Sequence, residues 1–479
     1  MCSGGTRTMR PPREFAANAL VAVRSKATAP NIGFASTRGL TAERRADPKG
    51  ESTVVGQPSR VEIALREHGL DSNLPMSKIA RMAINLELPK KYDSAVEQAH
   101  LAAEHIFRPV SRKYDKAEHE YPKELDDLGA LAKKAREAAK QSDKSGDTDA
   151  DAGTVNGANI RGVLHGVEMG WGDVALMLSI PYQGLGNAAI SAVATPEQLE
   201  KFSGVWAAMA ITEPSFGSDS AAVSTTATRD GDDYVINGEK IFVTAGSRAD
   251  HVVVWATVDK SAGRAAIKSF VVPLDADGVS VVRLEHKLGI KASDTAVLRF
   301  ENARVPAENL LGSPEVETKK AFAGVMQTFD NTRPVVAAMA VGLGRAALEE
   351  LRSLLGDAGH TIDYDAPAAT QHAAVAEFIR LESDWEASWL LAVRAAWMAD
   401  NKEPNSTEAS MSKAKAGRTV TDITNKAVEL GATAAFSETM LLEKWARDAK
   451  ILDIFEGTQQ IQQLIIARRI LGKSSADLK

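Results

Sequence analysis

One stretch of this 479-residue chain differs in pattern from the helical sequence on both sides of its region: Tyr234-Val235-Ile236-Asn237-Gly238-Glu239-Lys240-Ile241-Phe242-Val243. It holds two runs rich in β-branched and aromatic residues around Asn-Gly, the dipeptide most typical of a tight β-hairpin. Similar runs follow at residues 251–258, 268–273, 279–284 and 295–300. The pattern predicts a small β domain, as a barrel or a sandwich, over residues 206–314.

Helical periodicity lies on both sides of this region. It runs from about residue 86 to 140 and returns at residues 160–193, after a polar, glycine-containing stretch at 141–159 that we expect to be a flexible loop. Thr195-Pro196-Glu197-Gln198 is typical of a helix N-terminus. Three long helical patterns follow residue 319. We expect an α+β fold: a helical domain at 76–205, the β domain, and an antiparallel four-helix bundle at 315–479.

Length and composition exclude several classes of protein. A chain of 479 residues exceeds what one core usually holds, so two or three packed units are expected. Cys2 is the only cysteine, which excludes an internal disulfide framework and a multi-cysteine metal site. We assign no metal. No run of 18 apolar residues is present, so we expect no membrane span.

The N-terminal segment differs from the rest of the chain in charge. The formal net charge is −6, yet residues 1–50 carry nine Lys and Arg against three acidic residues. The remaining acidic body argues against nucleic acid as a partner. Residues 1–75 fit a disordered tail, a start placed too early with Met76 as the true start, or a mitochondrial transit peptide. We expect a bacterial cytoplasmic protein, with the mitochondrial matrix as the alternative.

A second informative stretch is Ile454-Phe455-Glu456-Gly457-Thr458-Gln459-Gln460-Ile461, which places one carboxylate between apolar residues and a glycine before a new helix. Burial raises the pKa of a glutamate toward the range in which a general base works near neutral pH. The alternative is a solvated Glu-Gly turn on the surface.

The segment Ile211 to Asp219 is a candidate cofactor site. A flavin ring needs hydrogen-bond donors along its edge and an apolar surface against its face. Thr212, Ser218 and backbone N–H groups around Gly217 could supply donors, while Phe242 and Thr244 could supply a ring and another hydroxyl. The alternative is that each hydroxyl bonds only to its own local backbone.

Two other segments match the dinucleotide fingerprint G-x-G-x-x-A, at residues 342–347 and 184–189. A nicotinamide dehydrogenase is therefore a rival hypothesis. The fingerprint requires a strand, a tight turn and a helix within a βαβ unit. Both copies lie in helical sequence, so we expect their glycines to allow close helix packing instead.

Taken together, several blocks resemble the acyl-CoA dehydrogenase family, with medium-chain-like motifs, over about residues 80–472. The resemblance implies an FAD-dependent oxidoreductase of fatty acid β-oxidation, which desaturates an acyl-CoA thioester to trans-2-enoyl-CoA and passes electrons to an electron-transfer flavoprotein. The matching blocks, in family order, are residues 211–219, 237–244, 288–295, 305–312, 330–338, 447–450 and 454–461.

The resemblance also implies roles for individual residues. The family places its catalytic base either in the Glu-Gly-Thr block or at the position of Thr332, and threonine has no carboxylate, so Glu456 inherits the role. The substrate would lie along Ser218, Asp330, Thr332, Arg333 and Gly457. FAD would be held by Ile211, Thr212, Ser218, Phe242, Val243, Thr244, Gln371, Thr458 and Gln460.

Two departures from the family pattern concern assembly. Residues 355–359 replace an Arg followed by Phe-Gly, and residues 431–435 replace Gly-Gly-x-Gly, although Gln371 is kept. In homotetrameric relatives these elements hold the ADP half of a neighbour's FAD. The resemblance therefore suggests a catalytic subunit of a heterotetramer of an actinobacterial type, and a homotetramer is the other possible assembly.

Alternative functions are a non-catalytic or flavin-poor partner subunit and an oxidase or nitroalkane-type enzyme. Acyl length and branching are undetermined.

Overall fold

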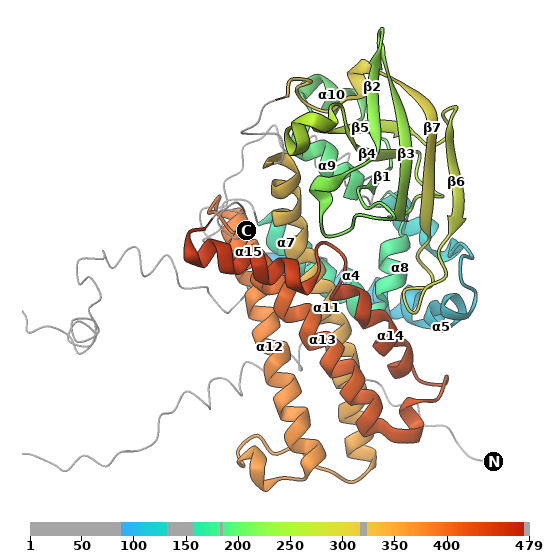
Figure 1. Ribbon diagram of the computed structural model, residues 1–479. Coiled ribbons are helices and arrows are strands. Elements are labelled where there is room, and N and C mark those ends of the chain that lie inside the picture. The colour runs from blue at the N-terminus through green and yellow to red at the C-terminus, as the bar shows by residue number, and fades with distance from the viewer. Residues whose placement is uncertain (1–87, 132–133, 135–156, 183–184, 317–322, 474–479) are drawn as a thin grey trace, which may run out of the picture. The chain divides into compact units, whose positions relative to one another are not determined.

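The computed structural model describes residues 88–131, 134, 157–182, 185–316 and 323–473. Nearly all of them belong to one compact unit made of residues 85–361 and 368–479. Within this unit, helices come first, a curled sheet follows, and long helices end the chain (Figure 1). This confirms the expected α+β class. The boundaries at residues 76, 206 and 315 stay predictions, and residues 1–75 and Met76 lie outside the described residues.

The N-terminal helices are interrupted where the sequence predicted continuity. The helical pattern of residues 86–140 ends at Lys116 and resumes only after Pro122. Thr195 caps its helix and forms a capping box with Gln198, as predicted. The 141–159 stretch is outside the described residues except for its end, which is already helical. The helices are α4 (Asp93–Ala102), a π turn (Ala103–Phe107), α5 (Arg108–Lys116), α7 (Ala158–Gly172), α8 (Val174–Ser179), α9 (Leu185–Val193) and α10 (Pro196–Lys201).

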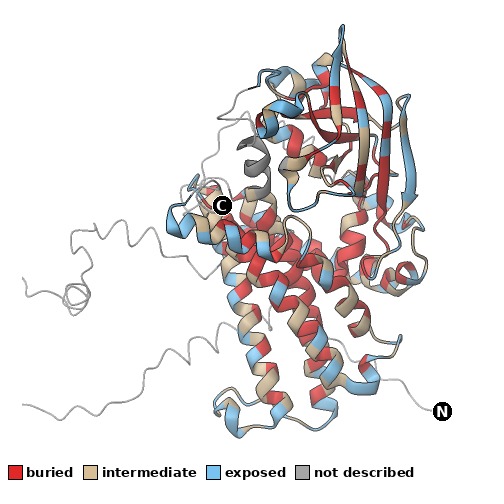
Figure 2. Cartoon of the chain, viewed as in Figure 1, coloured by how far each residue is buried: buried red, intermediate tan, exposed pale blue. Residues whose placement is uncertain are grey.

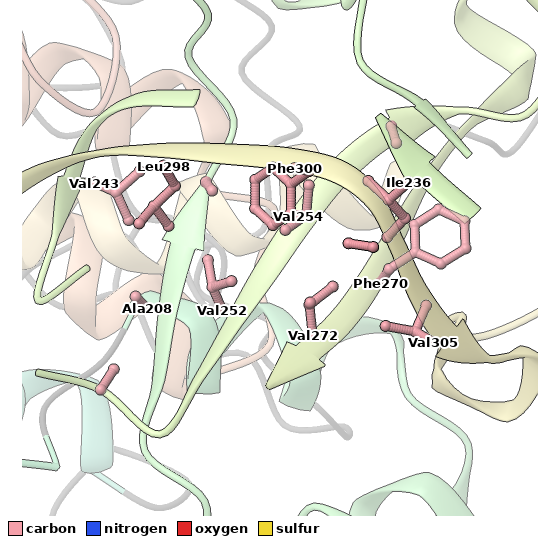
Figure 3. Close-up of a cluster of buried hydrophobic side chains, with 14 of the residues drawn as sticks. Ala208, Ile236, Val243, Val252, Val254, Phe270, Val272, Leu298, Phe300 and Val305 are labelled. Atoms are coloured by element: carbon pink, nitrogen blue, oxygen red, sulfur yellow. The ribbon is translucent and has the colours of Figure 1, made fainter. Parts of the chain in front are cut away.

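The middle of the chain forms one seven-stranded, curled sheet, a half-barrel. Its strand order is β1-β4-β2-β3-β7-β6, and β5 pairs with β4. Apolar side chains such as Val252, Phe270 and Phe300 fill its concave side (Figure 3). The strands are β1 (Ala207–Ala210), β2 (Thr226–Asp230), β3 (Asp233–Thr244), β4 (His251–Thr257), β5 (Ile267–Pro273), β6 (Val279–Leu284) and β7 (Thr295–Pro306).

The predicted hairpin at Asn237-Gly238 is wrong. Strand β3 passes straight through these residues, and the turn into it lies at residues 231–232, after Asp230. Asn237-Gly238 instead coincides with a bulge against β7, where the Asn237 side chain accepts a hydrogen bond from the backbone N–H of Asn302 at 2.8 Å. A Cβ on Gly238 would lie 2.4 Å from the Thr225 hydroxyl oxygen. Gly238 therefore serves close packing, and Gly231-Asp232 makes the turn.

Long antiparallel helices form the C-terminal part and bury their facing sides (Figures 1 and 2). Helix α11 packs against α12, α13 and α7. No helix in the described part of the chain is long and apolar enough to cross a membrane. The helices are α11 (Ala323–Asp357), α12 (Ala373–Asp400), α13 (Ser406–Ala435), α14 (Leu442–Leu452) and α15 (Gln459–Leu471).

The two G-x-G-x-x-A segments lie in α11 and α9, and neither opens a helix directly after a strand. A Cβ on Gly342 would lie 2.1 Å from the carbonyl oxygen of Val167, and one on Gly186 would lie 2.1 Å from that of Ala208. These glycines allow α11 to approach α7 and α9 to approach β1. The expectation that these glycines allow close packing is confirmed.

A buried ion pair joins the loop after β1 to strand β3. The Lys240 ammonium donates to the Glu213 carboxylate at 2.8 Å and to the Ile211 carbonyl oxygen at 3.0 Å. Ser224 and Thr225 each donate a backbone and a hydroxyl hydrogen bond to the same carboxylate. Burial alone would raise the pKa of Glu213, but Lys240 and these donors lower it to about 2.

We expect Glu213→Ala to lower the free energy of unfolding by about 3–5 kcal/mol, because it leaves the Lys240 charge buried without its partner. The matched control is Glu239→Ala, which removes an exposed pair with Arg299 and should cost less than about 1 kcal/mol. Denaturant titration measures both.

The same pair predicts a pH dependence. The folded pKa of Glu213 lies below the ordinary glutamate value, so its stabilisation is present above about pH 4.3 and is lost as pH falls toward 2. The stability difference between wild type and Glu213→Ala should therefore shrink across that window. A difference that stays constant from pH 5 to pH 2 would contradict an ionised pair.

Candidate active site

The segments predicted to hold a flavin edge lie side by side. The backbone N–H of Ile241 in β3 donates to the Thr212 carbonyl oxygen at 2.9 Å, directly beside the Glu213–Lys240 pair. The structure therefore brings Ile211 and Thr212 next to the end of β3, which carries Phe242. Sequence reasoning quoted Glu213 and Lys240 but gave them no role. Two opposite charges within predicted strand regions were the available signal.

Phe242 stands out at a β-bulge. Between the pairs Lys240–Leu298 and Val243–Ala296, two residues of β3 face a single residue of β7. Phe242 has a left-handed backbone with φ +58°, and 60% of its surface is exposed. Bulges of this kind redirect side chains next to functional sites. An aromatic ring held outward is what a planar ligand would cover.

The other predicted flavin contacts differ in how they are presented. Val243 is buried in the sheet core, so only its backbone is available to a ligand. Thr244 pairs with Thr295 at the end of β7 and is half-buried. Ser218 is exposed in the loop that follows β1. These placements suit a ligand lying across the edge of the sheet, where backbone and hydroxyl donors are reachable.

The second half of the candidate site is the turn between α14 and α15. Glu456 and Gly457 both have left-handed backbones, with φ of +57° and +91°. The side chain of Thr458 caps α15 by accepting from the Ile461 N–H at 3.3 Å. Thr458 is half-buried and Gln460 is exposed. Sequence reasoning predicted a turn before a helix here, and the structure has one.

The Glu456 carboxylate points to Thr332 on α11. The Thr332 hydroxyl donates to it at 2.9 Å. Burial raises the pKa of Glu456, although this hydrogen bond and the charges of Arg333 and Lys413 act in the opposite direction. The two positions at which the family places its base are therefore adjacent in space. A carboxyl group with a raised pKa and one hydroxyl donor is chemically suited to accept a proton.

Arg333 and Asp330, expected along the substrate, form an internal pair. The guanidinium of Arg333 is buried and donates to the Asp330 carboxylate at 2.6 Å. Asp330 also accepts from the Ser406 hydroxyl at 3.1 Å, and burial raises its pKa. These contacts join α11 to the start of α13. Direct contact of Arg333 with a substrate stays a prediction.

A buried network fixes α14 against the rest of the unit. The Asp448 carboxylate accepts from the backbone N–H of Ile290 at 2.5 Å and from Lys444 at 2.5 Å. Lys444 also donates at 2.6 Å to Asp173, which caps α8. A Cβ on Gly289 would lie 2.4 Å from the Arg447 backbone, so this position must be glycine. The 288–295 and 447–450 motifs, far apart in sequence, thus meet here.

The predicted flavin residue Gln371 lies on another element. It is half-buried in the connection before α12. Residues 432–434 and 436 are exposed, and Ala432 has a left-handed backbone with φ +47°. A contact of Gln371 with a flavin stays a prediction.

One group among the described residues could hold a metal ion, although sequence reasoning assigned none. Glu118, His119 and His286 bring ligand atoms within 4.8 Å of one another. The Glu118 carboxylate pairs with the His286 ring at 3.0 Å and accepts from the backbone N–H of Lys287 at 2.8 Å. These contacts connect the loop after α5 to the loop after β6.

Comparison with known proteins identifies the family. The acyl-CoA dehydrogenase middle domain matches residues 208–303, and the acyl-CoA dehydrogenase C-terminal domain matches residues 322–471. These ranges contain the sheet and the long helices, together with the β3 bulge and the Glu456 turn.

Individual relatives agree with this assignment. The mitochondrial short-chain specific acyl-CoA dehydrogenase of Bos taurus is 31% identical over 408 residues, which cover 81% of this chain and 92% of the bovine one. The caffeyl-CoA reductase-Etf complex subunit CarC of Acetobacterium woodii is 33% identical, over 63% of this chain and 79% of its own. Butyryl-CoA dehydrogenase from Megasphaera elsdenii superimposes with a TM-score of 0.70 at 28% identity, over 81% of this chain and 100% of that one. The chain belongs to the acyl-CoA dehydrogenase family of oxidoreductases.

Proposed function

We propose that this protein is an FAD-dependent acyl-CoA dehydrogenase that converts an acyl-CoA thioester to its trans-2-enoyl-CoA, with Glu456 as the base. The observation that carries this proposal is the Glu456 carboxylate itself. It lies in a strained turn, accepts one hydrogen bond from Thr332 and has a pKa raised by burial. Such a group removes a weakly acidic proton more readily than a solvated carboxylate does.

In the proposed reaction Glu456 takes the α-proton of the thioester. The negative charge that develops on the thioester oxygen requires a donor, and the backbone N–H of Glu456 is the one we assign to it. Thr332 keeps the carboxylate directed during this step, because its hydroxyl donates to one carboxylate oxygen and leaves the other for the proton. Asp330 and Arg333 fix the start of the helix that carries Thr332.

The flavin edge of the chain fits FAD. Phe242 offers an exposed ring, while Thr212, Thr244 and Ser218 offer hydroxyl groups around it. Ile211, Val243, Thr458 and Gln460 complete the set that we assign to the same cofactor, and Gln371 would act across a subunit boundary. Bound FAD would accept the β-hydride of the substrate.

The electron acceptor that we propose is an electron-transfer flavoprotein. The support is the name of the 33% identical Acetobacterium relative, a subunit of an Etf complex. The relatives' names also refer to short-chain substrates and to butyryl-CoA, so a short acyl-CoA is the first substrate to test. A cytoplasmic location in a bacterium is the proposal, with the mitochondrial matrix as the alternative, since the bovine relative is named as mitochondrial.

Glu456→Gln should lower kcat by about 10³-fold or more, because the amide cannot accept the α-proton. Flavin content and the free energy of unfolding should change little, since Gln has nearly the same shape. The measurement is anaerobic bleaching of the flavin by a panel of acyl-CoAs, followed by turnover with an electron-transfer flavoprotein. Glu301→Gln, at an exposed site, is the matched control. Full activity in Glu456→Gln would exclude Glu456 as the base.

Phe242→Ala separates a ligand-binding ring from a packing ring. Because Phe242 is exposed, its removal should change the stability of the flavin-free protein by less than about 0.5 kcal/mol. The dissociation constant for FAD should rise, which fluorescence titration measures. The control is Phe300→Ala in the sheet core, which should cost about 3–5 kcal/mol. Unchanged FAD affinity in Phe242→Ala would remove this residue from the cofactor site.

We further propose that this chain works in a heterotetramer with a related subunit. The support is the pair of departures from the family pattern at residues 355–359 and 431–435, of which residues 432–434 are exposed. The alternative of a flavin-poor partner subunit predicts the same assembly but no need for Glu456.

Purification of the chain alone and with a co-expressed related subunit tests the assembly. We expect the chain purified alone to retain little flavin, and the co-expressed complex to have full flavin content. Light scattering should show that this complex is a heterotetramer. A fully loaded, active homotetramer from this chain alone would refute the proposal. Activity of the heteromer that survives Glu456→Gln would favour the flavin-poor alternative.

A further inference from the structure

Lys413 on α13 is almost completely buried behind the Glu456 turn. It is 1% exposed, and its ammonium donates to the carbonyl oxygen of Gly457 at 2.7 Å. Burial of an ammonium group is costly unless partners compensate for the lost hydration. A lysine that only filled space could be replaced by methionine at lower cost. The position of this charge next to the proposed base therefore calls for an explanation.

Close packing of α13 against the end of α14 lets the Lys413 side chain reach the Gly457 carbonyl oxygen. Gly417 lies one turn further along α13, and a Cβ on it would lie 2.7 Å from the Leu452 carbonyl oxygen at the end of α14. Helix α13 can therefore approach the end of α14 closely, because Gly417 has no side chain there. The four-carbon stem of Lys413 then spans the remaining gap to Gly457.

The turn depends on contacts from outside itself. A left-handed conformation costs a non-glycine residue such as Glu456 about 1–2 kcal/mol. The Gln462 side-chain amide donates to the carbonyl oxygens of Glu456 at 2.9 Å and of Gly457 at 3.1 Å. Lys413 is the second donor to Gly457 and the charged one. The two donors hold the two successive peptide groups that follow Glu456 in the turn.

The charges around Lys413 come from three elements. Asp453 lies at the end of α14, Glu456 lies in the turn, and Arg333 lies on α11. Burial lowers the pKa of Lys413 to about 8, while Asp453 and Glu456 raise it and Arg333 lowers it. The ammonium form therefore predominates at pH 7. Its charge in turn lowers the pKa of Glu456, against the effect of burial.

We infer that Lys413 is a positioning residue for Glu456, which fixes the turn through the Gly457 carbonyl oxygen and places a positive charge beside the carboxylate. The catalytic consequence depends on the proposed role of Glu456 as the base. The structural part, a lysine that sets the charge and the backbone of this turn, does not.

Three variants separate the two effects. Lys413→Met removes both the charge and the donor, and Lys413→Gln keeps a donor without the charge. Lys415→Met is the matched control on the same helix, because the Lys415 ammonium pairs with Asp384 on α12 instead of with the Glu456 turn. The Glu456 carboxyl is titrated by difference infrared spectroscopy against Glu456→Gln, and hydrogen exchange is followed at the amides of residues 455–459. Neither readout needs substrate.

Both Lys413 variants should titrate Glu456 at a higher pH than wild type, and exchange at residues 455–459 should speed up more in Lys413→Met than in Lys413→Gln. In the control variant, the Glu456 titration and the exchange at residues 455–459 should both match those of wild type. In turnover, Lys413→Met should lower kcat by about 10- to 100-fold, with KM within about threefold and the acidic limb of the pH profile moved to higher pH.

An unchanged Glu456 titration in both folded Lys413 variants would overturn the inference, and so would the same shift in Lys415→Met. Should Lys413→Met fail to fold, Lys413→Gln decides on its own through the titration. If Glu456 titrates as expected but wild type shows no dehydrogenase activity, the proposed function fails while the role of Lys413 in the turn stands.

Discussion

The buried ammonium of Lys444 holds the separate parts of this chain in one arrangement. It lies between Asp173 at the start of α8 and Asp448 one turn along α14, and Asp448 also binds the backbone N–H of Ile290 in the loop after β6. N-terminal helices, sheet and C-terminal helices thus meet at one charge. Removal of any one partner would leave another charge buried without compensation. The network therefore favours a single docking geometry over many similar ones.

The candidate site inherits its geometry from this junction. Helix α14 is fixed at Asp448, and the turn that carries Glu456 follows the end of this helix at Leu452. The flavin edge has the same construction on the sheet side, where the Glu213–Lys240 pair holds the loop after β1 against the β3 bulge. In both places an ion pair is buried behind the site, and the residues assigned to ligands stand in front of it. Buried ion pairs that hold the backbone of a site in place suit catalysis by preorganised groups.

The sequence predicted element types well because periodicity and capping are local. Thr195 and the long helices after residue 319 are examples. Asn237-Gly238 misled because the tertiary pairing of β3 with β7 overrode a local turn preference, while Gly231-Asp232 makes the turn. The acceptors Glu213, Gly457 and Asp173 of the buried lysines at 240, 413 and 444 lie 27, 44 and 271 residues away, so no local pattern could reveal them. The apolar neighbours of Glu456 left a surface turn open, and the family resemblance assigned it the role of base.

Backbone strain is common to the two halves of the candidate site. Phe242 and Glu456 are both non-glycine residues in left-handed conformations, one at the flavin edge and one in the proposed base. Such conformations persist only where surrounding contacts over-determine them. Here those contacts are the Glu213–Lys240 pair beside Phe242 and the Lys413 and Gln462 donors beside Glu456. The left-handed backbone turns the Phe242 ring outward and directs the Glu456 carboxylate to Thr332. An unstrained backbone would not place these two groups there, so the strain is the cost of their positions.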